Sequence, residues 1–297
     1  MTAAPFPLAI PRRTALSARA VVVMTLVVLA IVSAMYLQLG LGSLFPSAPG
    51  LHAAQKFFAR ALSPAIARES EVPAGTPPLF VSALRAAWMT VIVATAAMSL
   101  AVVIGLLLAF VASSAWWMGD PAGARSRWSR IVRRSIVPAT YGAVRVVIAS
   151  MRSTHELLWA VLFLAAFGLT QTSAVLAIAM PFGGTLAKVF SEMIDEAPRD
   201  AAMALRAAGA SPLQVFVFGL LPRALPDLTA YAFYRFECSL RASAVLGFFG
   251  FPTLGYYIAA SFENLQYGEV WTYLYTLFAL VLAVDAWSGA LRRRLVT

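Results

Sequence analysis

The sequence predicts an all-α membrane protein with six transmembrane helices. Of its 297 residues, 61% are hydrophobic and only 12% are charged, whereas an ordinary soluble domain has about 25% charged residues. The apolar residues form runs near the length of roughly 20 residues that crosses a bilayer core as a helix, and basic residues gather between these runs. This composition excludes a soluble globular protein and a disordered chain. The single cysteine, Cys238, excludes a disulfide scaffold.

The apolar runs place the expected spans. They lie at residues 20–39, 84–115, 144–169, 172–190, 228–249 and 270–290. The third and fifth runs carry charged residues. The first run has two interpretations, a cleaved signal peptide or a retained helix. We favour a retained helix, because the apolar run exceeds the usual length of about 7–15 residues and no small-residue cleavage site follows it.

Basic residues set the expected orientation. The formal net charge is +10, which in a soluble protein would suggest nucleic acid; in a membrane chain it marks the cytoplasmic side, so we expect no nucleic-acid partner. A cytoplasmic N-terminus at residues 1–19 and a cytoplasmic tail at 291–297 fit an even number of spans. The basic residues then inside are Arg12, Arg13, Arg19, Arg125, Arg127, Arg130, Arg133, Arg134, Lys188, Arg199, Arg206, Arg223, Arg292, Arg293 and Arg294, and those outside are Lys56, Arg60, Arg68 and Arg85.

Residues 40–83 form the expected extracytoplasmic loop, which is rich in proline. Within it, residues 51–69 have the pattern of a helix lying on the membrane, with Phe57, Phe58, Leu62 and Ile66 toward lipid. An irregular cap without a separate role fits the same sequence equally well.

The inner segment 192–226 has the signals of two short helices joined by a tight elbow. Asp195 is a suitable N-cap for the first helix, with Pro198 in its first turn. Gly209 supplies a left-handed stop, and Ser211-Pro212 starts the second helix, which we expect to end at Leu221-Pro222. The segment is then either a docking site for another protein or a connecting or re-entrant helix pair.

The spacing in this segment resembles the Glu-Ala-Ala signature loop of ABC importer permeases. Met203-Ala204-Leu205 precedes Gly209 by the interval of the signature, and Leu221-Pro222 closes it. The family's Glu falls on Met203 and its Ile on Gly219, so Asp200 or Glu196 takes the place of the acidic residue, or the contact is rebuilt through Arg206. The resemblance implies a cytoplasmic coupling helix that contacts an ATPase through Asp200, Met203, Ala204, Leu205, Arg206, Gly209, Ala210 and Ser211.

Two further stretches resemble phosphonate-type ABC permeases, and the likeness covers about residues 140–290. Residues 231–237 and 241–248 are similar to the fifth helix of that family. Residues 152–160 are similar to its third helix, which usually has Pro where His155 stands. The glycine-rich stretch after the fifth helix keeps Gly250 and Gly255.

The resemblance implies a type I ABC importer permease fold in the bacterial inner membrane, with both termini in the cytoplasm. It implies a permease subunit that forms the path for phosphonate, phosphite or a similar phosphorus oxyanion by alternating access. The implied partners are a cytoplasmic ABC ATPase dimer, an extracytoplasmic solute-binding protein and a second copy of the chain in a homodimer. The chain then has no cofactor of its own, because ATP and Mg belong to the ATPase.

Charged side chains inside the expected spans must face the bundle interior or a wet cavity, because charge in lipid is costly. In one interpretation they line or gate an anion path. In the other, Arg152–Glu156 and Glu237–Arg241, each four residues apart on a helix, are internal ion pairs. The residues concerned are Arg152, Ser153, His155, Glu156, Arg235, Glu237 and Arg241.

The sequence has no phosphate-binding G-x-x-x-x-G-K-[ST] loop, so ATP hydrolysis is not expected in this chain and we do not expect an enzyme. An ion-coupled secondary transporter or channel for a small anion is the main alternative, although we find no inverted repeat of interrupted helices. A membrane enzyme acting on lipid phosphates through His155 and Arg152, and a purely structural subunit, are weaker alternatives.

Overall fold

The computed structural model describes residues 18–40, 42, 45–69, 75–114 and 136–295. The described residues are helical with no strand, and they divide into two compact units, residues 1–58 and 59–297. Four helices are long and apolar enough to span a membrane on their own, and six spans result if each of two bent helix pairs counts as one. The predicted all-α membrane class is confirmed. The basic residues expected at 1–17 and within 115–135 lie outside the described residues.

The first unit contains α1 (Ala18–Tyr36) and most of α2 (Ala48–Ala59). The helix α1 matches the first predicted span and exposes large apolar side chains on every side, from Val21 to Tyr36. Such a surface requires lipid or another apolar partner around it. The helix α2 begins before the predicted interfacial helix and stops at Ala59, where a short 3-10 turn, η2 (Arg60–Leu62), follows.

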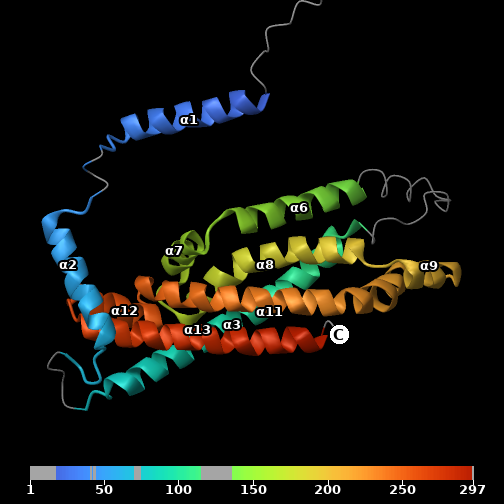
Figure 1. The fold of residues 1–297 in the computed structure, drawn as a ribbon. Helices are drawn as coiled ribbons and strands as arrows, with labels where there is room; N and C mark the ends of the chain where they lie inside the picture. The colour runs from blue at the N-terminus through green and yellow to red at the C-terminus, as the bar shows by residue number, and fades with distance from the viewer. Residues whose placement is uncertain (1–17, 41, 43–44, 70–74, 115–135, 296–297) are drawn as a thin grey trace, which may run out of the picture. The chain divides into compact units, whose positions relative to one another are not determined.

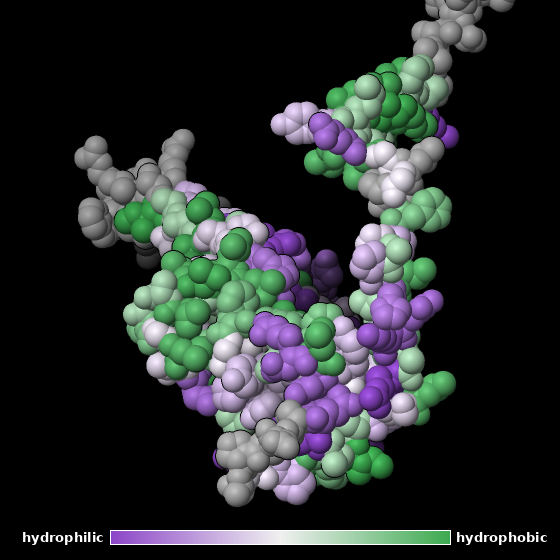
Figure 2. Space-filling view, turned by 90° about the vertical axis from the view of Figure 1, so that its left-hand side faces the viewer, coloured by the Kyte–Doolittle hydropathy of each residue, from purple (hydrophilic) through white to green (hydrophobic). Residues whose placement is uncertain are grey.

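The second unit is a bundle around α8 (Gln171–Glu196). Figure 1 shows α3 (Leu79–Ala112), α8, α11 (Leu221–Leu246) and α13 (Tyr267–Leu295) running side by side, with α9 (Asp200–Ala207) at one end and α12 (Leu254–Glu263) at the other. Figure 2 looks at the α12 end and shows hydrophilic side chains gathered there beside broad hydrophobic areas. An apolar flank with a polar end is the surface that a membrane bundle needs.

Small residues let α8 pack closely against two neighbours. A Cβ on Gly105 of α3 would lie 2.7 Å from Leu186 Cβ, and a Cβ on Gly184 would lie 2.7 Å from Met151 Cβ. These glycines therefore serve close helix packing. Pro181 stands inside α8, which continues through it to Glu196.

The third predicted span is not one helix. It consists of α6 (Val137–Ser153) and α7 (Glu156–Phe167), which meet at an angle of 95°. Thr154 is extended at the break, and the His155 side chain caps α7 by accepting a hydrogen bond from Leu157 N at 3.3 Å. Hydropathy alone predicted a continuous helix because it does not register a capped break between two apolar helices.

Asp195 does not cap a helix, as the sequence had suggested. It lies in the last turn of α8, where its carboxylate accepts hydrogen bonds from Ser113 Oγ at 2.6 Å and Ser114 N at 3.0 Å. It therefore fastens the end of α3 to α8. Arg145 contributes to the same end of α3, donating to the carbonyl oxygen of Ala112 at 3.4 Å.

The elbow after α9 agrees with the sequence analysis. Gly209 has φ of +84°, and Ser211 forms a capping box with Gln214 at the start of α10 (Pro212–Gln214). The predicted stop at Leu221-Pro222 is wrong, because the chain passes through a π-helical segment, η5 (Val215–Leu220), directly into α11. The wider π turn accommodates the missing N–H and the bulky ring of Pro222.

A glycine contact joins the end of α11 to α12. A Cβ on Gly255 would collide with the carbonyl oxygen of Ala244, and a Cβ on Gly247 would collide with the backbone of Tyr256. Beside this contact, Thr90 of α3 accepts a hydrogen bond from Leu254 N at 3.1 Å. The end of α11 and the start of α12 are thus held to each other by close backbone packing, and the start of α12 is held to α3 by a buried hydrogen bond.

Residues 60–69 form a strap that is hydrogen-bonded to the start of α13. Glu69 N donates to Glu269 Oε1 at 2.8 Å, and Gly268 N donates to Glu69 Oε2 at 3.3 Å. On the strap, Leu62 is 95% exposed and Ile66 is 93% exposed. Leu62 ends η2 and Ile66 lies in the irregular residues after it, so the predicted helix over residues 51–69 does not extend to them.

We predict that Gly255→Ala destabilises the bundle by about 2–3 kcal/mol, because the added Cβ meets a backbone atom that cannot move independently. Gly142→Ala is the control, since no heavy atom lies within 4 Å of a Cβ built there. Thermal unfolding of the purified protein in detergent measures both variants. Equal melting temperatures for Gly255→Ala and Gly142→Ala would contradict the packing described here.

Candidate functional site

One polar pocket gathers most of the charged residues that the sequence placed inside the spans. It has a volume of about 480 Å³ and lies between the α6–α7 break, the middle of α8 and α11. Six of the seven candidate path residues line it, and only Glu237 does not. The lining residues are Arg152, Ser153, Thr154, His155, Glu156, Pro181, Phe182, Thr185, Arg235, Cys238, Arg241, Ala242 and Val245.

The helix break and Gly184 together position Arg152. Arg152 lies in the last turn of α6, and its backbone N would lie 3.2 Å from a Cβ on Gly184. Because glycine has no side chain, the end of α6 rests against the middle of α8. Trp159 of α7 fixes the corner, since its Nε1 donates to the carbonyl oxygen of Met151 at 3.3 Å.

Arg235 enters the pocket from α11 between two aromatic rings. Its guanidinium carbon lies 5.0 Å from the ring centroid of Phe182 and 6.0 Å from that of Tyr231. Its Nε is buried and has no hydrogen-bond partner among the described residues. Cation–π contacts of this kind hold a guanidinium in place without neutralising its charge.

Arg241 lies on α11 beyond Arg235 and is exposed. Its Nη2 lies 3.5 Å from Cys238 Sγ, a weak acceptor. Within the described part of the chain, none of the guanidinium groups of Arg152, Arg235 and Arg241 is within ion-pair distance of a carboxylate. The pocket therefore presents three guanidinium groups that form no ion pair with the described residues.

The one carboxylate of the pocket, Glu156, contacts His155. His155 Nε2 lies 3.5 Å from Glu156 Oε2, and His155 Nδ1 accepts the capping hydrogen bond from Leu157 N. His155 therefore contacts the carboxylate through one ring nitrogen and caps α7 through the other. The interpretation of Arg152 and Glu156 as an ion pair is wrong, because the helix break separates them.

Glu237 points away from the pocket. Its Oε1 lies 3.1 Å from Arg292 Nη2 of α13. On the same side of α11, Phe233 packs edge-on against Trp287 with ring centroids 5.6 Å apart. The interpretation of Glu237 and Arg241 as an ion pair is also wrong, and Glu237 instead belongs to the packing of α11 on α13. Ser153 lines the pocket, but its hydroxyl donates to its own helix at Ser150.

Sequence reasoning missed several pocket residues. Pro181, Phe182 and Thr185 of α8 line the pocket, and so does Cys238 of α11. No signal in the sequence links these residues to Arg152, since only the tertiary fold brings α6 and α8 together. The described residues contain no cluster of His, Cys, Asp and Glu that would hold a metal ion.

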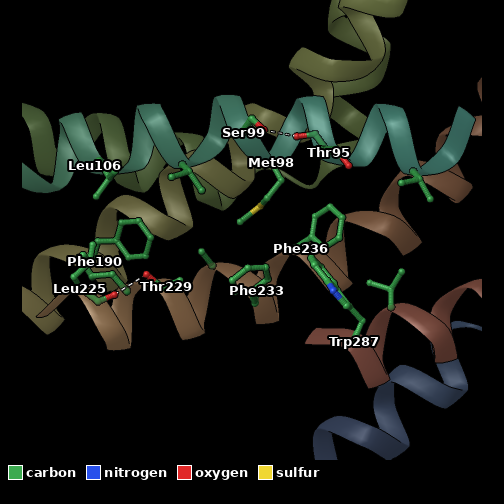
Figure 3. Close-up of a pocket in the computed structure, with 15 residues that line it drawn as sticks. Thr95, Met98, Ser99, Leu106, Phe190, Leu225, Thr229, Phe233, Phe236 and Trp287 are labelled. Carbon is green, nitrogen blue, oxygen red and sulfur yellow. Dashed lines mark hydrogen bonds between the residues drawn. The ribbon is translucent and has the colours of Figure 1, made fainter. Parts of the chain in front are cut away.

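A larger pocket of about 780 Å³ lies elsewhere in the bundle, between α3, α8, α11 and α13. Figure 3 shows its apolar lining, including Met98, Phe190, Phe236 and Trp287. The hydroxyls of Ser99 and Thr229 donate to carbonyl groups of their own helices, and no charged side chain lines the pocket. Its chemistry suits apolar groups, whereas the smaller pocket suits an anion.

At the α9 end, the coupling residues predicted by the sequence divide between two faces of α9. Ala202 is buried and, with Leu205, packs against Gly219 of η5, where a Cβ would lie 3.1 Å from Ala202 Cα. The glycine in place of the family's Ile therefore allows α9 to pack closely. The exposed residues of α9 are Asp200, Met203, Ala204, Arg206 and Ala207, and four of them, Asp200, Met203, Ala204 and Ala207, share the face opposite η5.

Residues 79–297 match the family described as binding-protein-dependent transport system inner membrane component. The chain belongs to this family. It is 37% identical over 214 residues to the phosphite transport system permease protein PtxC of Stutzerimonas stutzeri, an alignment that covers 69% of this chain and 70% of that protein. It is 33% identical over 183 residues to the putative phosphite transport system permease protein HtxE of the same organism, covering 59% and 70%. It is 31% identical over 159 residues to the phosphate-import permease protein PhnE of Mycolicibacterium smegmatis, covering 54% and 30%.

Solved structures agree with this fold. An inward-facing MetNI methionine ABC transporter superposes with a TM-score of 0.59 at 21% identity, covering 74% of this chain and 99% of that one. An amino acid ABC transporter superposes with a TM-score of 0.56 at 18% identity, covering 72% and 94%. The predicted type I ABC importer permease fold is confirmed. The chain is a multi-pass inner membrane component of a transport system, and no finding supports an ion-coupled secondary transporter or channel.

We predict that the Glu237–Arg292 contact stabilises α11 on α13. Glu237→Gln and Arg292→Gln should each lower stability by about 1–3 kcal/mol, because each leaves a partly buried charge without its partner. The double variant should lose less than the sum of the two. Arg294→Gln, an exposed neighbour on the same helix, serves as the control. Strictly additive losses in thermal unfolding would show that the two side chains do not interact.

Proposed function

We propose that this chain is the permease subunit of an ATP-driven importer for phosphite, phosphonate or a similar small phosphorus oxyanion. The observation that carries the proposal is the pocket in which Arg152, Arg235 and Arg241 converge without a carboxylate partner. Uncompensated arginines inside a membrane bundle favour an anionic ligand. The names of the relatives, which refer to phosphite and phosphate import, support a phosphorus oxyanion.

The proposed partner at the cytoplasmic side is an ABC ATPase dimer, which holds ATP and Mg while this chain holds no cofactor. The exposed face of α9 with Asp200, Met203 and Ala204 supports this contact, since the opposite face is already occupied by η5. Arg206, also exposed, flanks that face. Asp200 supplies an acidic group one turn before the position where relatives have Glu.

In the proposed mechanism, α11 connects the ATPase contact to the polar pocket lined by Arg152, Arg235 and Arg241, which we call the arginine pocket. The chain runs from the Gly209 elbow through η5 into α11 without a helix break, and α11 carries Arg235 and Arg241. A displacement of α9 by the ATPase would therefore move these two arginines relative to Arg152 on α6. This movement would open the pocket first to one side of the membrane and then to the other.

The remaining proposed partners follow from the transport class. An extracytoplasmic binding protein would deliver the solute, and a second copy of the chain, in a homodimer, would close the pathway, because the pocket opens to the surface of a single subunit. Both termini lie in the cytoplasm in this arrangement, with the strap at residues 60–69 outside. The Arg-rich segments support this orientation.

Uptake of phosphite or methylphosphonate into liposomes tests the proposal. We expect uptake only when the permease, an ATPase partner, the binding protein and ATP are all present. A complex whose ATPase lacks its catalytic base should bind ATP but import nothing. Equal uptake without the ATPase, driven by an ion gradient, would overturn the proposal.

We predict that Gly209→Val uncouples ATP hydrolysis from uptake, whereas Gly209→Asn retains most activity. Gly209 has φ of +84° with no heavy atom within 4 Å of a Cβ, so the limit is the backbone conformation and not space. Asn tolerates the left-handed region and a β-branched residue does not. The measurement is the ratio of solute imported to ATP hydrolysed. Unchanged coupling in Gly209→Val would contradict a role for this elbow.

A further inference from the structure

The arginine pocket holds an excess of two positive charges. Arg152, Arg235 and Arg241 line it together with a single carboxylate, that of Glu156. Glu237, the other acidic residue of the neighbouring helix turn, is directed to Arg292 of α13. No other acidic residue lines the pocket, so the imbalance is a property of the site and not of one side chain.

The surroundings of Arg235 strengthen the attraction for an anion. Phe182 and Tyr231 flank its guanidinium, and the unpartnered Nε is buried. Apolar neighbours lower the local dielectric, which makes each charge–charge interaction stronger than in water. A planar guanidinium also matches two oxygens of a tetrahedral oxyanion.

Glu156 opposes the same anion. It lies in the first turn of α7, lines the pocket and contacts His155. Its side chain is 25% exposed, so its charge is only partly screened. An oxyanion that enters the pocket approaches a fixed negative charge, which weakens its binding.

We infer that the pocket is a weak binding site, within the permease itself, for a small oxyanion carrying two negative charges, and that Glu156 limits its affinity. The inference rests on the proposed import of a phosphorus oxyanion and adds the charge state that the pathway selects. A dianion neutralises the two excess positive charges of the pocket, whereas a monoanion leaves one of them without a counter-charge. Limited affinity suits a site through which the solute must pass, because a tight site would retain it.

Direct binding measurements test the charge selection. The permease–ATPase complex in nanodiscs, without binding protein and nucleotide, is titrated with methylphosphonate and with its monomethyl ester. The pH is set where methylphosphonate carries two charges and the ester one. We expect methylphosphonate to bind about tenfold more tightly, the difference of one charge-assisted contact. Equal affinities for the two probes would overturn the inference.

Variants then separate charge from folding. Arg152→Gln and Arg241→Gln should each reduce the preference for methylphosphonate several-fold, whereas Arg235→Lys, which retains the charge, should keep it. Arg85→Gln removes an exposed arginine of α3 that does not line the pocket and should leave both affinities unchanged. An equal loss of preference in Arg85→Gln would show that the preference depends on the overall charge of the protein. That result would overturn the proposed site.

The role of Glu156 predicts a change of the opposite sign. Glu156→Gln should bind methylphosphonate several-fold more tightly than the unmodified complex, with a smaller gain for the singly charged ester. Weaker binding in this variant would overturn its assignment as a limit on affinity. The binding data are independent of the uptake test: ATP-driven import with equal binding of both probes defeats this inference alone, and selective binding with ATP-independent uptake defeats only the proposed function.

Discussion

The contact of Gly184 in α8 with the backbone of Met151 and Arg152 is the interaction on which the arrangement of the polar pocket depends. Because glycine occupies this position, the end of α6 rests on the middle of α8 and the chain turns by 95° into α7. That turn brings the Arg152 side chain and the start of α7 to the side of α8 that faces α11. A larger residue in place of Gly184 would push the two helices apart at the point where the pocket forms.

The second organising feature is the uninterrupted path from the elbow to the pocket. A proline such as Pro222 commonly ends a helix. Here the π-helical η5 instead continues directly into α11 and connects it to the segment that contains α9 and the Gly209 elbow. Gly219 within η5 allows Ala202 of α9 to pack against the same segment. The coupling helix and the helix that carries two of the pocket arginines are therefore parts of one packed structure, in which a shift at one end is transmitted to the other.

Several acidic groups of the bundle have specific partners, unlike the pocket arginines. Asp195 fastens α3 to α8, Glu69 and Glu269 fasten the strap to α13, and Glu237 pairs with Arg292. The pocket arginines have aromatic rings, a thiol or solvent as neighbours instead. Three unpaired arginines gathered at one pocket inside a membrane bundle mark a place where a ligand of opposite charge can bind.

The sequence by itself determined the membrane class, the approximate spans, the elbow at Gly209 and six of the residues that line the pocket, because hydropathy, turn chemistry and the cost of charge in lipid act locally along the chain. It did not determine the break at Thr154 and His155, the partner of Glu237 or the packing role of Gly184 and Gly219. Those features depend on contacts between helices that are distant in sequence. Helical spacing paired Arg152 with Glu156 and Glu237 with Arg241, but the tertiary structure decided otherwise, since one helix is broken and the other turns its carboxylate toward α13.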